Sequence, residues 1–218
     1  MEIKIQKKVL EANETQAEKN RNSFKDKNVF VLNVMSSPGS GKTETLCKTL
    51  KMLMPKIRTG VIVGDICTRN DAQRLEASGV KVVQINTDQF GGDCHLTANM
   101  IEKAAKEFDL DNLDLMIVEN IGNLVCPAEF DIGENARVVV LSVTEGEDKP
   151  LKYPLMFQVA DAAILNKIDL LPYLDFNAQE AVDNMQKVHP AMPVFKLSAK
   201  TEEGFLPWIE WISSCVGR

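Results

Sequence analysis

Residues 29–43 read VFVLNVMSSPGSGKT. The first seven letters are almost continuously apolar, as in a buried strand, and a turn rich in glycine and serine then leads into a helical stretch that ends before Pro55. The letters GSGKT match the end of a phosphate-binding loop, in which backbone N–H groups and a helix N-terminus bind phosphate oxygens. The residues expected to hold the phosphates are Pro38, Gly39, Ser40, Gly41, Lys42 and Thr43.

One position departs from the loop pattern G-x-x-x-x-G-K-[ST], because Ser36 stands where the first glycine is expected. A glycine-rich connection without function is therefore the alternative. The strand before the turn and the helix after it favour the phosphate loop. Lys42 would reach the β- and γ-phosphates, and the Thr43 hydroxyl would ligate Mg²⁺. Glu44 is expected to point outward, because a carboxylate facing a triphosphate would repel it.

Outward from the loop, apolar runs alternate with helical stretches, which is typical of a parallel sheet covered on both faces. We predict an α/β fold with a single doubly wound, mostly parallel sheet, as in P-loop NTPases, over residues 28–218. Residues 1–27 are predicted to form an N-terminal helical extension, solvated and outside the main fold, with a frayed segment as the alternative. The predicted strands are 29–35, 60–63, 80–85, 113–118, 137–143, 161–165 and 193–197. Further helices are predicted at about 69–78, 95–107, 176–188 and 204–214.

The composition excludes several classes of protein. The chain has 218 residues, 44% hydrophobic and 26% charged, which excludes disorder, collagen and coiled coil as descriptions of the whole chain. A net charge of −6 is a poor basis for binding nucleic acid. No apolar run approaches the roughly 20 residues that span a bilayer. The five cysteines are scattered and odd in number, which favours buried thiols or metal ligands over disulfides. We expect a cytoplasmic protein that binds neither nucleic acid nor membrane.

Two downstream segments indicate guanine as the base. Asn166-Lys167-Ile168-Asp169 follows the strand predicted at 161–165. An aspartate there can accept hydrogen bonds from two N–H groups of guanine, a donor pair that adenine lacks. Ser198, Ala199 and Lys200, after the last predicted strand, resemble the supporting guanine loop of GTPases.

Two carboxylates fall where a magnesium ion would need them. Asp65 ends the second predicted strand and Glu119 ends the fourth. Mg²⁺ is usually held by one or two carboxylates together with phosphate oxygens and water. Strand-end carboxylates that face solvent are the alternative. The segment from Glu119 to Gly122 occupies the place of the GTPase D-x-x-G segment, which senses the γ-phosphate.

Cys94, His95 and Cys126 form a candidate transition-metal site. Each follows a predicted strand, and in parallel sheets the loops after the strands share the edge where ligands bind. Thiolates and imidazole suit Ni²⁺ or Zn²⁺. Cys94 is expected near a helix N-terminus, which would favour its thiolate. Free cysteines that are simply buried are the alternative.

With these residues in hand, the sequence resembles the hydrogenase nickel-incorporation GTPases, the HypB family of SIMIBI-class P-loop GTPases, over nearly its whole length. The most specific block is 119–127, which ordinary GTPases lack. The other segments that carry the resemblance are 36–43, 64–65, 70–71, 94–96, 144–149 and 166–169.

The resemblance implies a metallochaperone that uses GTP and Mg²⁺ to deliver Ni²⁺ to a maturing [NiFe]-hydrogenase, with Zn²⁺ as the other candidate metal. It implies a GTP-dependent homodimer with the Cys–His–Cys group near its interface and Lys152 reaching the partner's nucleotide. The implied partners are a HypA-type nickel accessory protein and the hydrogenase large-subunit precursor.

Three departures from the family stand out, and one is Glu44, which replaces a residue that is commonly small and bears on GTP affinity. Residues 1–46 contain no Cys or His, so an N-terminal high-affinity metal site and a His-rich nickel store are not expected. The segment 88–93 is longer than the short glycine turn usual before the Cys-His pair, and Asp93 could add an oxygen ligand.

The residues expected to carry the reaction are Lys42, Thr43, Asp65 and Glu119. Because no Gln follows Gly122 to orient water, turnover is expected to be slow. A nucleotide-gated scaffold with negligible hydrolysis, and a related GTPase that matures another metalloenzyme, are the alternatives.

Overall fold

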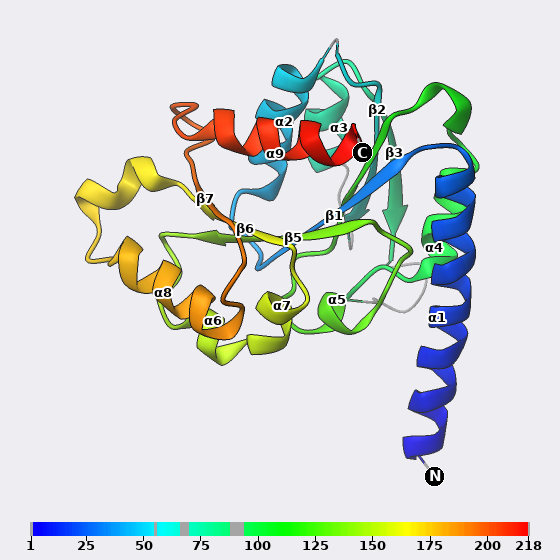
Figure 1. The fold of residues 1–218 in the computed structure, drawn as a ribbon, viewed down its shortest axis with the longest axis horizontal. Helices are drawn as coiled ribbons and strands as arrows, with labels where there is room; N and C mark the ends of the chain where they lie inside the picture. Colours follow the sequence, from blue (N-terminus) through cyan, green and yellow to red (C-terminus); the bar gives the residue numbers. More distant parts are fainter. Residues whose placement is uncertain (1, 55, 66–69, 88–93, 218) are drawn as a thin grey trace.

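Seven parallel strands form one sheet in the order β3-β2-β4-β1-β5-β6-β7 (Figure 1). The computed structural model describes residues 2–54, 56–65, 70–87 and 94–217, with side chains from Val9 onward. All seven strands predicted from the apolar runs are confirmed. Their bounds are β1 Phe30–Ser36, β2 Thr59–Asp65, β3 Lys81–Asn86, β4 Leu115–Glu119, β5 Ala136–Ser142, β6 Ala162–Asn166 and β7 Val194–Lys196.

Helices cover both faces of the sheet (Figure 1). On one face α2, α3 and α9 pack over the central strands, and on the other α1 and α4 cover one half while α5, α7 and α8 cover the other half. The predicted doubly wound architecture is therefore confirmed. The helix bounds are α1 Glu2–Asp26, α2 Lys42–Leu53, α3 Asn70–Glu76, α4 Ala98–Ala105, α5 Cys126–Glu129, α6 Lys149–Lys152, α7 Pro154–Gln158, α8 Ala178–Val188 and α9 Phe205–Val216; the 3₁₀ segments are η2 Leu110–Asn112 and η3 Ile168–Tyr173.

The strand order places a ligand site at the carboxyl edge beside β1. The chain leaves β1 for β2 on one side, whereas β5, β6 and β7 lie on the other side, and such a reversal opens a crevice at the strand ends. In the β1–β4 pair Val34 lies opposite Glu119, so the loop after β1 and the last residue of β4 meet there.

Helix α1 packs against α4 and β1. Ala17 and Phe24 are buried, and so are the polar side chains of Asn13 and Asn20. The N-terminal half extends beyond the rest of the molecule (Figure 1). The predicted helix is confirmed, but the expectation that it lies solvated outside the main fold is wrong, because these side chains are buried against the rest of the protein. The two asparagines can be buried because their carboxamides are hydrogen-bonded. The boundary between residues 27 and 28 stays a prediction.

Among the helices that the structure describes, none combines the length and apolar character that crossing a bilayer requires.

Replacing Phe24 by Ala tests whether α1 belongs to the folded unit. Its ring is 2% exposed in the cluster that contains Ile101 and Met116, so Phe24→Ala should lower the free energy of unfolding by about 3–5 kcal/mol. Val9→Ala on the same helix should change it little, because Val9 is 53% exposed. Urea unfolding measures both variants, and equal stability of Phe24→Ala and parent would show that α1 packs loosely.

Candidate functional site

The loop between β1 and α2 wraps tightly enough to aim its backbone at a ligand. Gly39 and Gly41 adopt φ values of +76° and +91°, which side chains disfavour. A Cβ at Gly41 would lie 2.5 Å from Asn166 Nδ2, so only glycine fits against β6. Asn166 Nδ2 donates to Ser40 O at 2.9 Å, and Lys167 Nζ donates to Gly39 O at 2.7 Å. The predicted guanine segment thus helps to hold the phosphate loop.

A cleft of about 440 Å³ opens above this loop. It brings together residues from the ends of β1, β2 and β4 and from α2 and α3. Every residue predicted to hold phosphate or magnesium lines it. The lining residues are Pro38, Gly39, Ser40, Gly41, Lys42, Thr43, Glu44, Gly64, Asp65, Asp71, Arg74, Glu119, Asn120, Ile121, Gly122 and Lys167.

Lys42 is a buried cation at the base of the cleft. Its Nζ donates to Ser36 Oγ at 2.8 Å, so the serine that departs from the glycine pattern supplies an acceptor. Burial lowers the pKa of Lys42, while the carboxylate of Glu119 opposes that shift. A phosphate group would supply the negative charge that this buried ammonium needs.

Glu119 and Thr43 form the acidic side of the cleft. Thr43 Oγ1 donates to Glu119 Oε1 at 2.7 Å. Glu119 Oε2 is buried and has no hydrogen-bond partner among the described residues. Burial raises the pKa of Glu119 to about 7, although Lys42 and Thr43 act in the opposite direction. A buried carboxylate oxygen without a partner, beside a hydroxyl and Asp65, fits a hard divalent cation such as Mg²⁺.

The predicted guanine residues lie together at the ends of β6 and β7. Ser198 Oγ donates to Asp169 Oδ1 at 2.6 Å and accepts from the backbone N–H of Lys200 at 3.2 Å. Ala199, between them, is buried. The carboxylate of Asp169 is therefore held in place by the segment predicted to support it.

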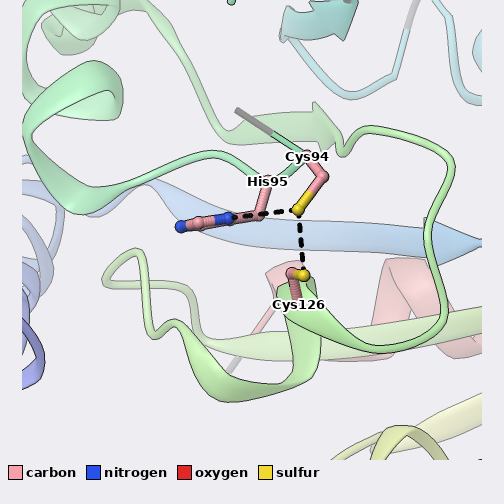
Figure 2. A group of neighbouring side chains, drawn as sticks. All are labelled: Cys94, His95 and Cys126. Atoms are coloured by element: carbon pink, nitrogen blue, oxygen red, sulfur yellow. Dashed lines mark hydrogen bonds between the residues drawn. The ribbon is translucent and has the colours of Figure 1, made fainter. Parts of the chain in front are cut away.

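Cys94, His95 and Cys126 lie close together although they come from two separate segments; the two thiols face each other, and the His95 ring extends to one side with its Nδ1 nearest Cys94 (Figure 2). The two Sγ atoms are 2.9 Å apart, and Cys94 Sγ lies 3.9 Å from His95 Nδ1. The candidate ligand atoms of the three residues all lie within 4.8 Å of one another. The imidazole stacks on Phe130 with ring centroids 3.8 Å apart. Two sulfurs and one imidazole nitrogen at these separations fit a soft or borderline metal ion.

The expected acidity of Cys94 is not borne out. Helix α4 begins at Ala98, so Cys94 lies outside its first turn. The pKa of Cys94 is raised, first by its hydrogen bond with the Cys126 thiol and then by burial. A bound cation would have to displace this proton.

Asparagine side chains join the Cys94 segment to the end of β4. Asn120, directly after Glu119, accepts from the Leu96 backbone N–H at 3.3 Å and from Ile121 N–H at 2.9 Å. Asn123 Nδ2 donates to Cys94 O at 3.3 Å. The sequence showed these residues only as part of a family block, and nothing in their spacing indicated this link.

Glu145 is a second contact that the sequence did not reveal. Its carboxylate accepts from Ser37 Oγ at 2.5 Å and from Ser142 N–H at 2.9 Å, which connects the phosphate loop to the segment leading into α6.

Lys152, in α6, does not line the cleft of its own chain. It is 62% exposed and pairs with Asp148 at 2.5 Å.

Glu44 lies at the rim of the cleft, half-exposed, and its charge is balanced by an ion pair with Arg74. The segment 88–93, with the candidate ligand Asp93, lies outside the described residues, as does Cys67.

The raised pKa of Glu119 predicts a pH dependence in the ligand-free protein. Because the folded state holds this proton more tightly than an unfolded chain with the ordinary value of 4.5, stability is lost as pH rises through about 7. Glu119→Gln removes this titration and keeps the oxygen that accepts from Thr43. Between pH 5.5 and 8 the parent should lose about 2 kcal/mol more than the variant. Chemical unfolding without nucleotide or Mg²⁺ measures this, and parallel pH profiles would contradict it.

Comparison with known proteins agrees with this geometry. Residues 30–196 match the family described as CobW/HypB/UreG, nucleotide-binding domain. Hydrogenase maturation factor HypB of Rhizobium leguminosarum bv. viciae is 47% identical over 99% of this chain and 71% of that protein. Among solved structures, HypB from Archaeoglobus fulgidus is 35% identical with a TM-score of 0.87, covering 94% of this chain and 98% of that one. HypB from Helicobacter pylori in complex with nickel is 38% identical, also with a TM-score of 0.87, covering 94% and 95%. This chain belongs to the HypB hydrogenase maturation factors of the CobW/HypB/UreG family.

Proposed function

We propose that the chain is a Mg²⁺-dependent GTPase that delivers nickel during [NiFe]-hydrogenase maturation, and that its nucleotide state controls metal binding at Cys94, His95 and Cys126. The observation that carries the proposal is the hydrogen bond from the Leu96 N–H to Asn120. It joins the metal-ligand segment to the residue next to Glu119 in the nucleotide cleft.

GTP would bind with its phosphates over the loop at residues 38–43 and its base at Asp169. The backbone N–H groups of the loop and the N-terminus of α2 supply positive potential, and Lys42 supplies a full charge. Asp169, fixed by Ser198, would accept the two guanine donors. Charge-assisted hydrogen bonds of this kind are stronger than neutral ones.

Thr43, Glu119 and Asp65 would hold the magnesium ion. When bound, Mg²⁺ neutralises the charge of the β- and γ-phosphates. Glu119 needs to lose its proton to serve as a ligand, and because burial raises its pKa to about 7, the ligand-free site still holds this proton in part near neutral pH.

Hydrolysis is expected to be slow. Asn123 stands after Gly122, where a GTPase would place a water-orienting Gln, and its carboxamide is already engaged by Cys94 O and the Val125 N–H. The same observation favours the second candidate, a nucleotide-gated scaffold with negligible hydrolysis. A single-turnover GTP cleavage assay distinguishes the two.

Nickel is the proposed cargo because the structure of HypB from Helicobacter pylori, a relative with the same fold, is of a complex with nickel. Thiolate and imidazole ligands also bind Zn²⁺.

We propose that the Cys94–His95–Cys126 group lies near the interface of a GTP-dependent homodimer. Val125, Leu151 and Leu155 are large apolar side chains that are 43–51% exposed beside Cys126 and Lys152, and a partner copy would cover them. In this arrangement Lys152 would reach the partner's nucleotide.

The proposed partners of the dimer are a HypA-type nickel accessory protein and the hydrogenase large-subunit precursor, encountered in the cytoplasm. They follow from the family and from the proposed cargo.

Asp169→Asn should weaken GTP binding about tenfold to hundredfold, because two charge-assisted hydrogen bonds to guanine are changed. Competition between GTP and xanthosine triphosphate measures the effect. Asp175→Asn, at a nearby exposed position, should behave like the parent. An Asp169→Asn protein with the parent's preference for GTP would contradict the guanine assignment.

Cys126→Ala should weaken Ni²⁺ binding more than about tenfold, since one of three ligands is removed and outer partners alone cost that much. GTP affinity of the monomer should stay near the parent value, because Cys126 does not line the cleft. Titration with Ni²⁺ and Zn²⁺ in the GDP and GTP-analogue states measures both effects. Cys215→Ala is the matched control, on α9.

Two outcomes would overturn parts of the proposal. Equal metal affinity of parent and Cys126→Ala would reduce Cys126 to an ordinary thiol. Equal metal affinity of the parent in the GDP and GTP-analogue states would leave the metal site but remove the switch. Coupling between two ligands is reciprocal, so a nucleotide that does not change metal affinity is itself unaffected by the metal.

A further inference from the structure

Two asparagines on α1 make buried hydrogen bonds. Asn13 and Asn20 are seven residues apart, so they lie on the same face of the helix two turns apart. They are 8% and 4% exposed, respectively. A carboxamide carries both donors and an acceptor, so each can join two backbone groups of different segments.

Asn13 joins the start of α4 to the chain after α5. Its Oδ1 accepts from the Ala98 N–H at 2.9 Å, and its Nδ2 donates to Asp131 O at 2.7 Å. Thr97, at the N-cap of α4, makes no capping hydrogen bond with its side chain to any described residue. Asn13 therefore satisfies the first N–H of α4 from a different helix.

Asn20 joins the same two segments, the start of α4 and the chain after α5, two helical turns from Asn13. Its Nδ2 donates to Ala98 O at 2.8 Å and to Ile132 O at 3.1 Å. Its Oδ1 accepts from Gln16 Nε2 at 3.0 Å, which fixes the orientation of the amide.

The backbone of α1 also lies directly against residues 131–133. A Cβ at Gly133 would lie 2.6 Å from Ala17 O, and Gly133 has φ +90°. Arg21 pairs with Asp131 at 2.6 Å. This close approach leaves little freedom for α1 to slide along the segment.

The two segments that α1 joins are the ones that carry the candidate metal ligands. Ala98 follows His95 by three residues, and Asp131 follows Cys126 by five. His95 also stacks on Phe130, the residue before Asp131. The separation between Cys94–His95 and Cys126 is therefore set in part by four hydrogen bonds from α1.

We infer that α1 is a brace for the metal site, with Asn13 and Asn20 as positioning residues that hold the two ligand-bearing segments at the spacing a metal ion needs. The inference rests on the proposed function in one respect, namely that Cys94, His95 and Cys126 bind the metal.

Removing the brace should weaken metal binding without touching a ligand. Asn13→Ala and Asn20→Ala should each reduce Ni²⁺ affinity about tenfold, the lower end of what loss of an outer-shell partner costs. The thiolate-to-nickel absorption band should also shift or weaken, because the ligand spacing changes. Affinity for GDP should stay at the parent value, because neither residue lines the cleft.

Three further variants separate bracing from loss of stability. Asn22→Ala changes the same residue type at an exposed position of α1. Ile212→Val loosens the core on the opposite face of the sheet. Asn13→Asp keeps the acceptor for the Ala98 N–H but removes the donor to Asp131, so it preserves the cap of α4 and cuts the bridge.

The full chain is titrated with Ni²⁺ alone, and the absorption spectrum and melting temperature are recorded for each variant. Weaker binding by Asn13→Ala, Asn20→Ala and Asn13→Asp, with parent-like binding by Asn22→Ala and Ile212→Val, would support the brace. Parent-like binding by Asn13→Asp, or a loss in Ile212→Val as large as in Asn13→Ala, would overturn it. If Cys126→Ala also binds like the parent, the metal site itself fails. If only Cys126→Ala loses binding, the site stands and the brace fails.

Discussion

The pairing of β1 with β4 is the constraint on which the site depends. Its register sets Val34 opposite Glu119, so the phosphate loop and the acidic end of β4 emerge side by side. The hydrogen bond from Thr43 to Glu119 is then possible across 76 residues of chain. A slip in this register would move Glu119 away from the loop and reverse the faces of a strand that is buried throughout. The hydrophobic core therefore protects the geometry of the cleft.

Lys42 and Glu119 are buried ionisable groups whose charged forms destabilise the ligand-free protein. Both are more than nine-tenths buried, and burial moves both pKa values toward the neutral form. Each is hydrogen-bonded to a neutral hydroxyl, Lys42 to Ser36 and Glu119 to Thr43. A nucleotide with a divalent cation would add opposite charge, phosphate at the ammonium and metal at the carboxylate. The site is thus less stable empty than filled, which is the usual condition of a binding site built from buried charges.

The strands and the phosphate loop could be predicted because each has a strong local signal. The short helices α5, α6 and α7 could not, since four or five residues do not display a helical period and each contains a proline near its start. The meeting of Cys94 with Cys126 followed from the topology of a parallel sheet. The acidity of Cys94 was predicted wrongly, because helix α4 begins at Ala98, three residues after the predicted start at residue 95. The packing of α1 was missed because its buried face is partly polar, and a hydrophobic pattern does not reveal hydrogen-bonded asparagines.

The segment from Cys94 to Thr97 belongs to no helix or strand, so contacts from elsewhere must fix its position. On the nucleotide side, Asn120 holds the Leu96 N–H and Asn123 holds Cys94 O. On the other side, Asn13 and Asn20 hold both backbone groups of Ala98. A change of nucleotide could move the first pair, which follows Glu119 in the chain, but it does not reach α1 directly. One end of the segment would then respond to nucleotide while the other end stays held by α1, and the distance between Cys94 and Cys126 would change.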